Sequence, residues 1–416
     1  MAEVDDAPAI VCSAPGSFAR SVLAERHPAL IEQVRDAFPW SPERHRALDA
    51  LLRSSTEGVI EPLGPLAHDR ERWDAWGAEY FGRSWFDVPF LWSESYFYRL
   101  LLEAVGYFGP GPWQGIDPFA PFKRAELRGS LVDDELAALD VLARRPVAER
   151  AAAYLQGSLW GNRADLSFTV GSQTADGGTD AGSDGSTEAR SGEAPPPLVA
   201  DDSEVLWSLL PTGGSPGAAR TVHVIADNSG RELIPDLVLI EHLLESGRAD
   251  DVVLHVKPYP YYVSDATMAD VVDCARRIAQ ASGEAGEAGE AGKRLWAAMG
   301  DGRLAVRAHG FFCAPFPYAE MPDELRRQFD GAALTIVKGD LNYRRLVGDR
   351  LWSPTASFSG RTAHFPGPVA ALRTLKSDVI VGLEPRTVAR LEDAAGDGKG
   401  RAWRTSGTHG LVQVRT

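Results

Sequence analysis

The second half of the chain alternates short β-branched runs with amphipathic helical patterns, and this alternation restricts the fold more than any other feature. The runs read TVHVIA at 221–226, DVVLHVK at 251–257, ALTIVK at 333–338 and DVIVGL at 378–383. The helical patterns IPDLVLIEHLLES and ATMADVVDCARRIAQ follow the first two runs. This order predicts an α/β fold with a mostly parallel sheet covered on both faces. Ligands of such sheets bind beyond the carboxyl ends of the strands.

The first half of the chain, from about residue 17 to 156, is predicted to be all-helical. Segments such as SVLAERHPALIEQVRDAF, ERWDAWGAEYFGRSW and DDELAALDVLARR repeat apolar residues at three- and four-residue spacing. Aromatic residues gather between 73 and 98, and we expect them to fill helix junctions rather than form a ligand cage. They are Trp73, Trp76, Tyr80, Phe81, Trp85, Phe86, Phe90, Trp92, Tyr96, Phe97 and Tyr98.

Two low-complexity stretches interrupt these patterns. GSQTADGGTDAGSDGSTEARSGEAPPP, at 171–197, has too few apolar residues to offset the entropy of ordering and is predicted to be a disordered insertion. SGEAGEAGEAGK, at 282–293, is predicted to extend a surface loop. The predicted organisation is a helical domain at 1–170, a disordered insertion at 171–200, and an α/β/α catalytic domain at 201–416 with a low-complexity loop at 282–293.

Composition excludes several classes of protein. The 416 residues carry 43 Lys and Arg against 58 Asp and Glu, and the net charge of −15 opposes binding to nucleic acid or anionic membranes. Cys12, Cys274 and Cys313 are far apart and show no zinc-binding spacing. The N-terminus has no basic, apolar leader, and no segment approaches ~20 uninterrupted apolar residues. We therefore expect a cytoplasmic protein.

Polar clusters occur at the expected strand ends. They read ADNSG at 226–230, KPYPYYVSDAT at 257–267, KGDLNYRR at 338–345 and RTLKSD at 373–378. The first two supply Asp227, Asn228 and Asp265, oxygen ligands that suit Mg²⁺ or Mn²⁺. The last two supply the cations Lys338, Arg344, Arg373 and Lys376, which suit a phosphate or another anion. Together they predict a metal that bridges a phosphorylated substrate to the protein.

Ordinary structural roles compete with this interpretation. Asp, Asn and Ser are common helix N-caps, so DNSG taken alone is more typical of a cap and turn than of a metal site. Similar alternatives exist for Asp265 as a cap, for Lys338 and Asp340 as a solvated turn, and for Arg373 with Lys376 as a surface pair. The functional interpretation depends on all four clusters following strands.

Several familiar motifs are missing from the sequence. A haloacid-dehalogenase phosphatase would carry a second Asp where Ser229 stands. The chain has no Walker GxxxxGK[ST] loop, no GxSxG elbow and no HExxH pair. The turn after the first expected strand, ADNSGRE, has one glycine, whereas a dinucleotide or S-adenosylmethionine site usually has a glycine-rich turn there.

Longer strings in the chain resemble a known family. DNSGRELIPDLVL, VSDAT, KGDLNYRRLVGDRLW and LRTLKSDVIVGL, with WFDVPFLWSESYFYR and SLWGNRADLS upstream, are similar to the metal-dependent damage-control phosphatases. The subfamily is the one named for acidic-residue methyltransferase one. The resemblance runs from about Trp73 to the C-terminus, outside the two low-complexity stretches.

The resemblance implies a Rossmann-like α/β/α domain that follows a helical N-terminal region. It also implies hydrolysis of phosphorylated metabolites, such as fructose 1-phosphate and fructose 6-phosphate, that depends on Mn²⁺, Co²⁺, Ni²⁺ or Mg²⁺. By motif match, the metal-ligand positions are Asp227, Asn228 and Asp265. The substrate-binding positions are Asp340, Leu341, Asn342, Tyr343, Arg344 and Lys376, and the subfamily's RTxK signature spans 373–376.

Chemistry suggests a role for some of these side chains. Lys376 and Arg344 would hold phosphate oxygens, and Asp340 would orient or deprotonate the attacking water. Glu232 would either order a metal-bound water or serve packing and capping. Asn162 and Asp165 would either reach the cleft from the helical side or serve structure alone.

Two other functions stay open on the sequence. The first is an S-adenosylmethionine-dependent methyltransferase that acts on protein carboxylates, which would need a cofactor site that the turn at 226–232 does not offer. The second is a non-catalytic protein that binds sugar phosphates. The physiological substrate, the preferred metal and the oligomeric state do not follow from the sequence.

Overall fold

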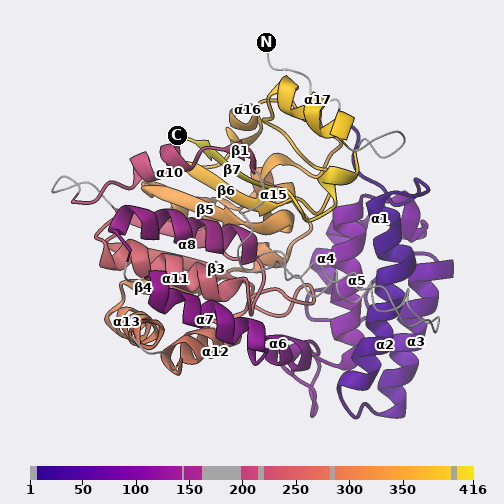
Figure 1. The fold of residues 1–416 in the computed structure, drawn as a ribbon. Coiled ribbons are helices and arrows are strands. Elements are labelled where there is room, and N and C mark those ends of the chain that lie inside the picture. Colours follow the sequence, from indigo (N-terminus) through magenta and orange to yellow (C-terminus); the bar gives the residue numbers. More distant parts are fainter. Residues whose placement is uncertain (1–6, 143–144, 162–197, 214–219, 282–285, 395–400) are drawn as a thin grey trace, which may run out of the picture.

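A sheet of parallel strands forms the centre of the α/β part (Figure 1). The structure, a computed structural model, describes residues 7–142, 145–161, 198–213, 220–281, 286–394 and 401–416. Within these ranges seven strands pair in the order β1-β7-β6-β5-β2-β3-β4. They are β1 (Leu198–Asp201), β2 (Thr221–Ile225), β3 (Asp251–Val256), β4 (Leu304–Ala308), β5 (Leu334–Lys338), β6 (Val369–Thr374) and β7 (Gly410–Arg415). Strands β2 to β6 run parallel and β7 is antiparallel to β6, which confirms the predicted α/β class.

Helices surround the sheet and precede it in the chain. In the first half they are α1 (Phe18–Ser21), the π-helix η1 (Val22–Arg26), α2 (His27–Ala37), α3 (Pro42–Glu57), α4 (Arg70–Gly77), η2 (Trp85–Asp87), α5 (Phe90–Val105), α6 (Ala120–Leu127), α7 (Ser130–Leu142) and α8 (Val147–Gly161). In the second half they are α10 (Ser203–Leu209), α11 (Leu233–Glu245), α12 (Met268–Ala279), α13 (Glu287–Asp301), η4 (Gly310–Cys313), η5 (Tyr318–Glu320), α14 (Asp323–Phe329), α15 (Gly339–Val347), α16 (Phe358–Thr362), α17 (Pro385–Ala394) and η6 (Ala402–Arg404).

Alternate residues of each strand bury on opposite faces of the sheet, because strand side chains point up and down in turn. In β2, Val222 and Val224 pack into a core shared with α8, α11 and α12, whereas Ile225 packs into a second core on the other face. Figure 1 shows α8 and α11 lying across the first face. The second core is continuous with the N-terminal helices.

The N-terminal helices α1 to α5 stand together at one side of the sheet (Figure 1). Helix α5 is buried on nearly every side and ends at Gly106, whose left-handed φ of 86° supplies the C-cap. The aromatic residues at 73–98 are mostly core, as predicted, with Trp73, Trp85 and Tyr96 at most 1% exposed. Tyr98 also lines a cavity.

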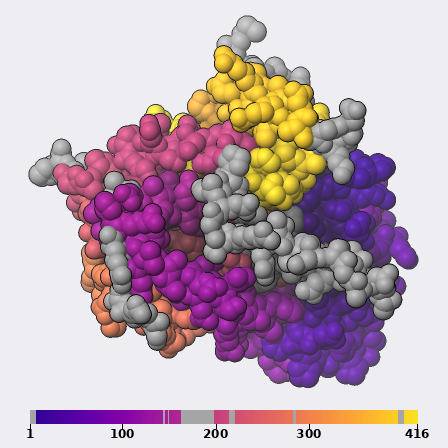
Figure 2. Space-filling model, viewed as in Figure 1, coloured from indigo at the N-terminus to yellow at the C-terminus, as the bar shows by residue number. Residues whose placement is uncertain are grey.

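The N-terminal and C-terminal parts meet directly. Ala9 pairs with Arg350 and Val11 with Pro89 in isolated bridges, so the segment before α1 joins the loop after α15 to the start of α5. In the space-filling view the yellow C-terminal segments lie beside the indigo N-terminal helices (Figure 2). Helix α8, from the first half of the sequence, packs against α11. The division into domains at residues 170 and 201 stays a prediction.

Three predictions about local structure are wrong, and a fourth, the surface loop at 282–293, is wrong in part. DVIVGL at 378–383 forms no strand; it is a mostly buried irregular segment, and the strand that pairs with β5 on its outer side is instead β6. Residues 198–200, placed in the disordered insertion, belong to β1. The ERWDAWGAEYFGRSW helix ends at Gly77.

The stretch at 282–293 is not a loop throughout, since α13 begins at Glu287. Its triplet repeat sets small residues on one helix face, where Ala288, Ala291 and Gly292 are buried. A side chain at Gly292 would come within 2.3 Å of the backbone of Ala279, so glycine permits the close approach of α12 and α13. The insertion at 171–197, and Asn162 and Asp165, lie outside the described residues.

Candidate active site

A cavity opens beyond the carboxyl ends of β2, β3, β5 and β6. Strands β3 and β4 are added to one side of β2, and the later strands β5 and β6 are added to its other side. The order of strand addition therefore changes side between the neighbouring parallel strands β2 and β5. Ligands of parallel sheets bind at such a switch point. The cavity has an empty volume of about 710 Å³, with open solvent at its mouth included.

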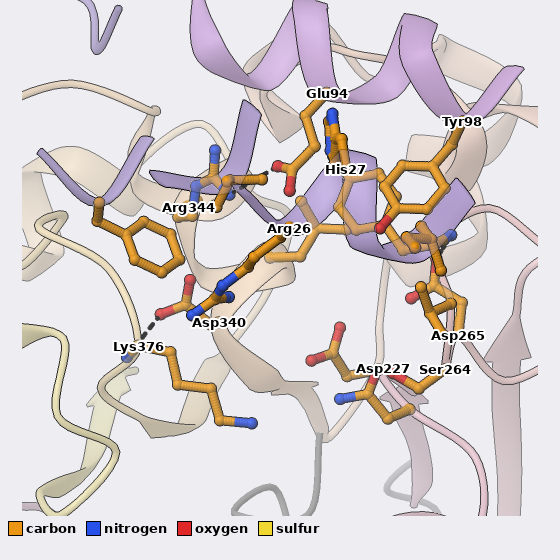
Figure 3. A pocket seen from close by; sticks show the side chains of 17 residues that line it. Arg26, His27, Glu94, Tyr98, Asp227, Ser264, Asp265, Asp340, Arg344 and Lys376 are labelled. Atoms are coloured by element: carbon orange, nitrogen blue, oxygen red, sulfur yellow. Dashed lines mark hydrogen bonds and ion pairs between the residues drawn. The ribbon is translucent and has the colours of Figure 1, made fainter. Parts of the chain in front are cut away.

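We call the strand-end side of this cavity the floor and the side made by the N-terminal helices the helical wall. The floor comprises Asp227, Asn228, Asp265, Asp340 and Lys376. The helical wall comprises Arg26, His27, Glu94 and Tyr98, together with Tyr262 from the loop after β3. Figure 3 shows Asp227, Asp265 and Lys376 facing Glu94, His27 and Tyr98 across the cavity.

Backbone pairing joins the loops after β2 and β3. Asn228 and Asp265 form an antiparallel bridge. On either side of it, the Ser229 amide donates to the Ser264 carbonyl at 2.7 Å and the Ala266 amide donates to the Asp227 carbonyl at 2.9 Å. The pairing fixes the three predicted metal ligands relative to one another without any help from their side chains.

The Asp227 carboxylate packs against the backbone of Gly339, the first residue of α15. A Cβ at Gly339 would lie 1.8 Å from Asp227 Oδ2 and 2.2 Å from Cγ. The φ of Gly339 is +83°, a region that side-chain-bearing residues rarely adopt. Two independent reasons therefore favour glycine at position 339: the backbone conformation and the closeness of the Asp227 side chain.

Asn228 is oriented by two neighbours. The Ser264 hydroxyl donates to its Oδ1 at 2.8 Å, and its Nδ2 donates to Glu232 Oε2 at 2.9 Å. Glu232 is 2% exposed and its Oε1 has no hydrogen-bond partner. Burial raises the pKa of Glu232 to about 7, against the opposing charge of Lys338 and with Asp236 adding to the rise. Because the Asn228 side-chain nitrogen donates to Glu232, its side-chain oxygen points toward Ser264.

Asp265 is 1% exposed and does not cap a helix, which removes one structural alternative. The N-cap of α12 is Thr267, in a capping box with Asp270. The backbone amide of Tyr262 donates to Asp265 Oδ2 at 2.9 Å, and Lys257 Nζ lies 4.0 Å from its Oδ1. Asp227 and Asn228 do not cap α11 either, because its N-cap position is Glu232, which makes no side-chain cap bond.

The donor set fits a hard divalent cation. Asp227, Asn228 and Asp265 bring two carboxylates and one amide oxygen to one buried corner, and oxygen ligands suit Mg²⁺ or Mn²⁺ better than a soft metal. The orphaned Glu232 Oε1 beside Asn228 is a further acceptor that needs a donor. In the described part of the chain no group of three or more His, Cys, Asp or Glu side chains is placed to hold a metal ion. The candidate set is of another kind, since one of its members is an amide.

Asp340 accepts hydrogen bonds from the RTxK segment and from the residue after it. Arg373 donates to Asp340 Oδ1 through Nε at 2.8 Å, and the Lys376 amide and the Ser377 hydroxyl donate to the same oxygen at 3.2 and 3.1 Å. Arg373 is fully buried and also donates to the Val379 carbonyl. Arg373 therefore shapes the loop that carries Lys376 and does not itself line the cavity.

Other predicted substrate-binding residues lie behind the floor. Lys338 pairs with Asp236 at 2.9 Å and donates to Ser158. Asn342 Nδ2 donates to the Ala226 carbonyl at 3.0 Å, which fixes the end of β2. The Tyr343 hydroxyl contacts Gln413 at 2.9 Å. None of Lys338, Asn342 and Tyr343 lines the cavity, whereas Leu341 and Arg344 do.

Arg344 is a paired cation. It lies 3.4 Å from Glu94 and 2.7 Å from Asp349, and it is 3% exposed. Burial raises the pKa of Glu94 to about 7, while the charge of Arg344 and its hydrogen bond to Glu94 act in the opposite direction. The Glu94 and Asp349 carboxylates thus compensate the positive charge of Arg344, which the sequence alone suggested would bind a phosphate.

The helical wall was not predicted from the sequence, which indicated residues at strand ends and, on the helical side, only Asn162 and Asp165. Arg26 closes the π-helix η1 and His27 opens α2. Glu94 and Tyr98 lie four residues apart, on the same face of α5. One signal was available, because the string WFDVPFLWSESYFYR includes both Glu94 and Tyr98. Arg26 and His27 lie in an ordinary amphipathic pattern that gave no sign of a cavity.

Comparison with known proteins identifies the class. Residues 22–391 match the family described as the damage-control phosphatase ARMT1-like domain. The chain therefore belongs to the ARMT1-like damage-control phosphatases, which confirms the predicted resemblance. Membership supports a phosphatase that acts on metabolites.

Individual relatives are similar over nearly their whole length. Damage-control phosphatase ARMT1 of Mus musculus is 31% identical, with 96% of each chain covered. The Danio rerio protein of that name is 30% identical, over 96% of this chain and 94% of its own, and the Homo sapiens protein is 28% identical, with 96% of each covered. A crystal structure of a DUF89 family protein from Pyrococcus horikoshii covers 88% of this chain and 92% of its own, with 16% identity and a TM-score of 0.43.

Proposed function

We propose that the chain is a metal-dependent phosphatase that hydrolyses phosphate monoesters of sugars, fructose 1-phosphate and fructose 6-phosphate among them. The observation that carries the proposal is the backbone bridge between Asn228 and Asp265, which lies at the switch point of the sheet and supports Asp227, Asn228 and Asp265 as candidate oxygen ligands. Lys376 lines the same cavity and offers a cation to the phosphate.

Asp227, Asn228 and Asp265 would hold a divalent ion, Mn²⁺, Co²⁺, Ni²⁺ or Mg²⁺. When bound, such an ion supplies Lewis-acid polarisation of the phosphoryl group. The chain's own part is to bind and orient the ester. The Lys376 ammonium would contact phosphate oxygens on which negative charge grows, and the N-terminus of α15 favours an anion in the same place.

Asp340 has a narrower role than the sequence suggested. Its Oδ1 accepts hydrogen bonds from Arg373, Lys376 and Ser377, so that oxygen is already occupied by protein donors. We assign to Asp340 the positioning of Lys376, and to its Oδ2 the orientation of the attacking water. Arg373, Lys338, Asn342 and Tyr343 would act on the substrate only through the residues that they hold.

Phosphate release tests the proposal. Purified protein is stripped with a chelator, resupplied with Mn²⁺, Co²⁺, Ni²⁺ or Mg²⁺, and given a panel of phosphorylated sugars. We expect release that depends on the added metal. Absence of turnover with every metal and every ester would overturn the proposal, and methyl transfer from labelled S-adenosylmethionine without metal would favour the methyltransferase instead.

A further inference from the structure

The helical wall contains a buried histidine whose ring nitrogens have no partner. His27 is 1% exposed, lines the cavity, and makes no hydrogen bond through Nδ1 or Nε2. Its ring stacks on Phe97 with centroids 3.7 Å apart and meets Tyr98 edge-on at 5.7 Å. Burial, assisted by the charge of Arg26, lowers its pKa to about 3, so the ring is neutral.

An unsatisfied polar ring at this position needs an explanation, because buried polar groups nearly always find partners. A neutral imidazole has one nitrogen that donates and one that accepts. A hydroxyl group both donates and accepts, so it can hydrogen-bond to either nitrogen. Phenylalanine would make the same stack on Phe97 without leaving any polar atom buried, so stability alone does not account for His27.

Glu94 lies on the same wall and is prepared to accept hydrogen bonds. Arg344 holds it in an ion pair at 3.4 Å, and the Tyr262 hydroxyl hydrogen-bonds to it. A carboxylate can accept up to about four hydrogen bonds, more than these two donors provide. Glu94 is 8% exposed, so further donors must come from inside the cavity.

The charges beside Glu94 argue against a second anionic group of the substrate at that place. The other cation of the wall, Arg26, lies over the ring of Phe18. Arg344 is already compensated by both Glu94 and Asp349. A second phosphate placed there would meet Glu94. The stacked rings of Tyr98 and Tyr262, with centroids 4.6 Å apart, add an apolar surface for C–H groups. Neutral hydroxyls on a carbon skeleton match all three features.

We propose that Glu94 and His27 bind hydroxyl groups of the substrate and select polyhydroxylated phosphate monoesters over esters without hydroxyls. The inference rests on the proposed function in one respect, that the floor takes the phosphate group. Glu94 and His27 thus determine specificity, while the floor acts on any phosphate monoester that reaches it.

Two variants test this selection. Glu94→Gln keeps the shape of the side chain and leaves Arg344 its pair with Asp349. His27→Phe keeps the stack on Phe97 and removes both nitrogens. The matched control is Glu241→Gln, a buried glutamate that is paired with Arg294 and lies outside the cavity. Each protein is assayed with fructose 6-phosphate and with p-nitrophenyl phosphate, which has no hydroxyls.

For each of the two wall variants, we expect kcat/KM for fructose 6-phosphate to fall at least about tenfold, chiefly through KM, with the loss of hydrogen bonds to hydroxyls. The value for p-nitrophenyl phosphate should stay within about twofold, as should both values for Glu241→Gln. Equal losses on both esters would overturn the inference, because they would show that the wall only supports the floor. Unchanged discrimination would overturn it as well.

Binding without catalysis separates this inference from the proposed function. Isothermal titration of chelator-treated protein compares fructose 6-phosphate with inorganic phosphate. We expect the sugar phosphate to bind tighter, and Glu94→Gln to lose about tenfold of that advantage. If the wild type shows this advantage but hydrolyses no ester, the proposed function fails and the inference stands. If it hydrolyses both esters but shows no advantage that depends on Glu94, the inference alone fails.

Stability gives a last check on His27. Since its nitrogens have no partners within the described residues, His27→Phe should leave the melting temperature unchanged or raise it. A fall of several degrees would show that the ring nitrogens have a structural partner, and would contradict the assignment of His27 to the substrate.

Discussion

The floor and the helical wall of the cavity are held in place by different means. Backbone geometry places the candidate metal ligands of the floor, through the bridge between Asn228 and Asp265 and the fit of Asp227 against Gly339. Side-chain hydrogen bonds from Asn228 to Glu232 and from Arg373 to Asp340 add to it. Side-chain contacts fix the wall, through the stack of His27 on Phe97 and the ion pair of Glu94 with Arg344. Backbone geometry suits a group that is common to all substrates, while side-chain contacts change easily with single substitutions. The contrast supports the proposed division of the cavity, with the phosphate at the floor and the rest of the substrate at the wall.

The largest expected effect comes from removing a floor carboxylate. Asp265→Ala deletes one of two candidate carboxylate ligands and should lower phosphate release on the order of 10² to 10³-fold for every ester. The fold should survive, because the backbone bonds of this loop do not use the side chain. Steady-state kinetics together with circular dichroism measure both quantities. Activity within a few fold of the wild type would remove Asp265 from the site.

A pair of glycines tests whether backbone geometry fixes the floor. Gly339→Ala should displace Asp227 and weaken metal binding by about 10 to 100-fold, with a matching loss of activity. Gly331 has a similar φ of +76° but open space around it, so Gly331→Ala should cost about 1 kcal/mol of stability with activity retained. Metal titration and denaturant unfolding distinguish the two. Equal effects would mean that backbone strain, not Asp227, accounts for the loss.

Lys376 should affect all esters alike, unlike the wall residues. Lys376→Ala removes a cation from the floor and should lower kcat/KM by about 10 to 100-fold for both fructose 6-phosphate and p-nitrophenyl phosphate. Assays of both esters with one preparation give the ratio of the losses. A loss confined to the sugar phosphate would move Lys376 from the floor to the recognition of the sugar.

The smallest expected effect is a pH dependence that belongs to the wall. The raised pKa of Glu94, about 7, means that the carboxylate and its acceptor capacity are present above pH 7 and are lost as the pH falls. The ratio of KM for Glu94→Gln to KM for the wild type should therefore be about tenfold near pH 8 and approach one near pH 6. Comparison at equal pH cancels titration of the substrate.

The neighbours of Glu94 whose pKa is shifted titrate far from pH 7, so the titration of Glu94 can be measured separately. Its charged and titratable neighbours are Arg344, Asp349, Tyr262 and Cys12, with Arg26 and His27 in the same cavity. Burial raises the pKa of Cys12 to about 12 and lowers that of His27 to about 3, so neither titrates near pH 7. A KM ratio that stays constant between about pH 6 and pH 8 would show that the Glu94 carboxylate does not bind substrate.

The sequence predicted the floor because its chemistry follows strands in order. The β-branched runs at 221–226, 251–257 and 333–338 are strands, and Asp227, Asp265 and Asp340 follow them as expected. The fourth strand was placed wrongly, since β-branched residues at 378–383 bury in an irregular segment while the alanine-rich β6 forms the strand. Tertiary burial overrides strand propensity there.

The roles of arginines and of the wall could not be predicted from the sequence. Arg373 and Arg344 look like phosphate-binding cations in a motif, yet both are buried and paired with carboxylates from other segments. Glu94 lies 250 residues from Arg344 along the chain, and no local pattern reports such a pairing. His27 lines the cavity from the first position of α2. Among the described residues, no helix has both the length and the apolar character needed to cross a membrane.

The central claim is that Asp227, Asn228 and Asp265 form one divalent-cation site. Titration of chelator-stripped protein with Mn²⁺, followed by the electron paramagnetic resonance of the free ion, tests it without any substrate. We predict one bound Mn²⁺ per chain in the wild type and in Glu94→Gln, and none at the same concentrations in Asp265→Ala. Full Mn²⁺ binding by Asp265→Ala, or no binding by the wild type, would contradict the claim.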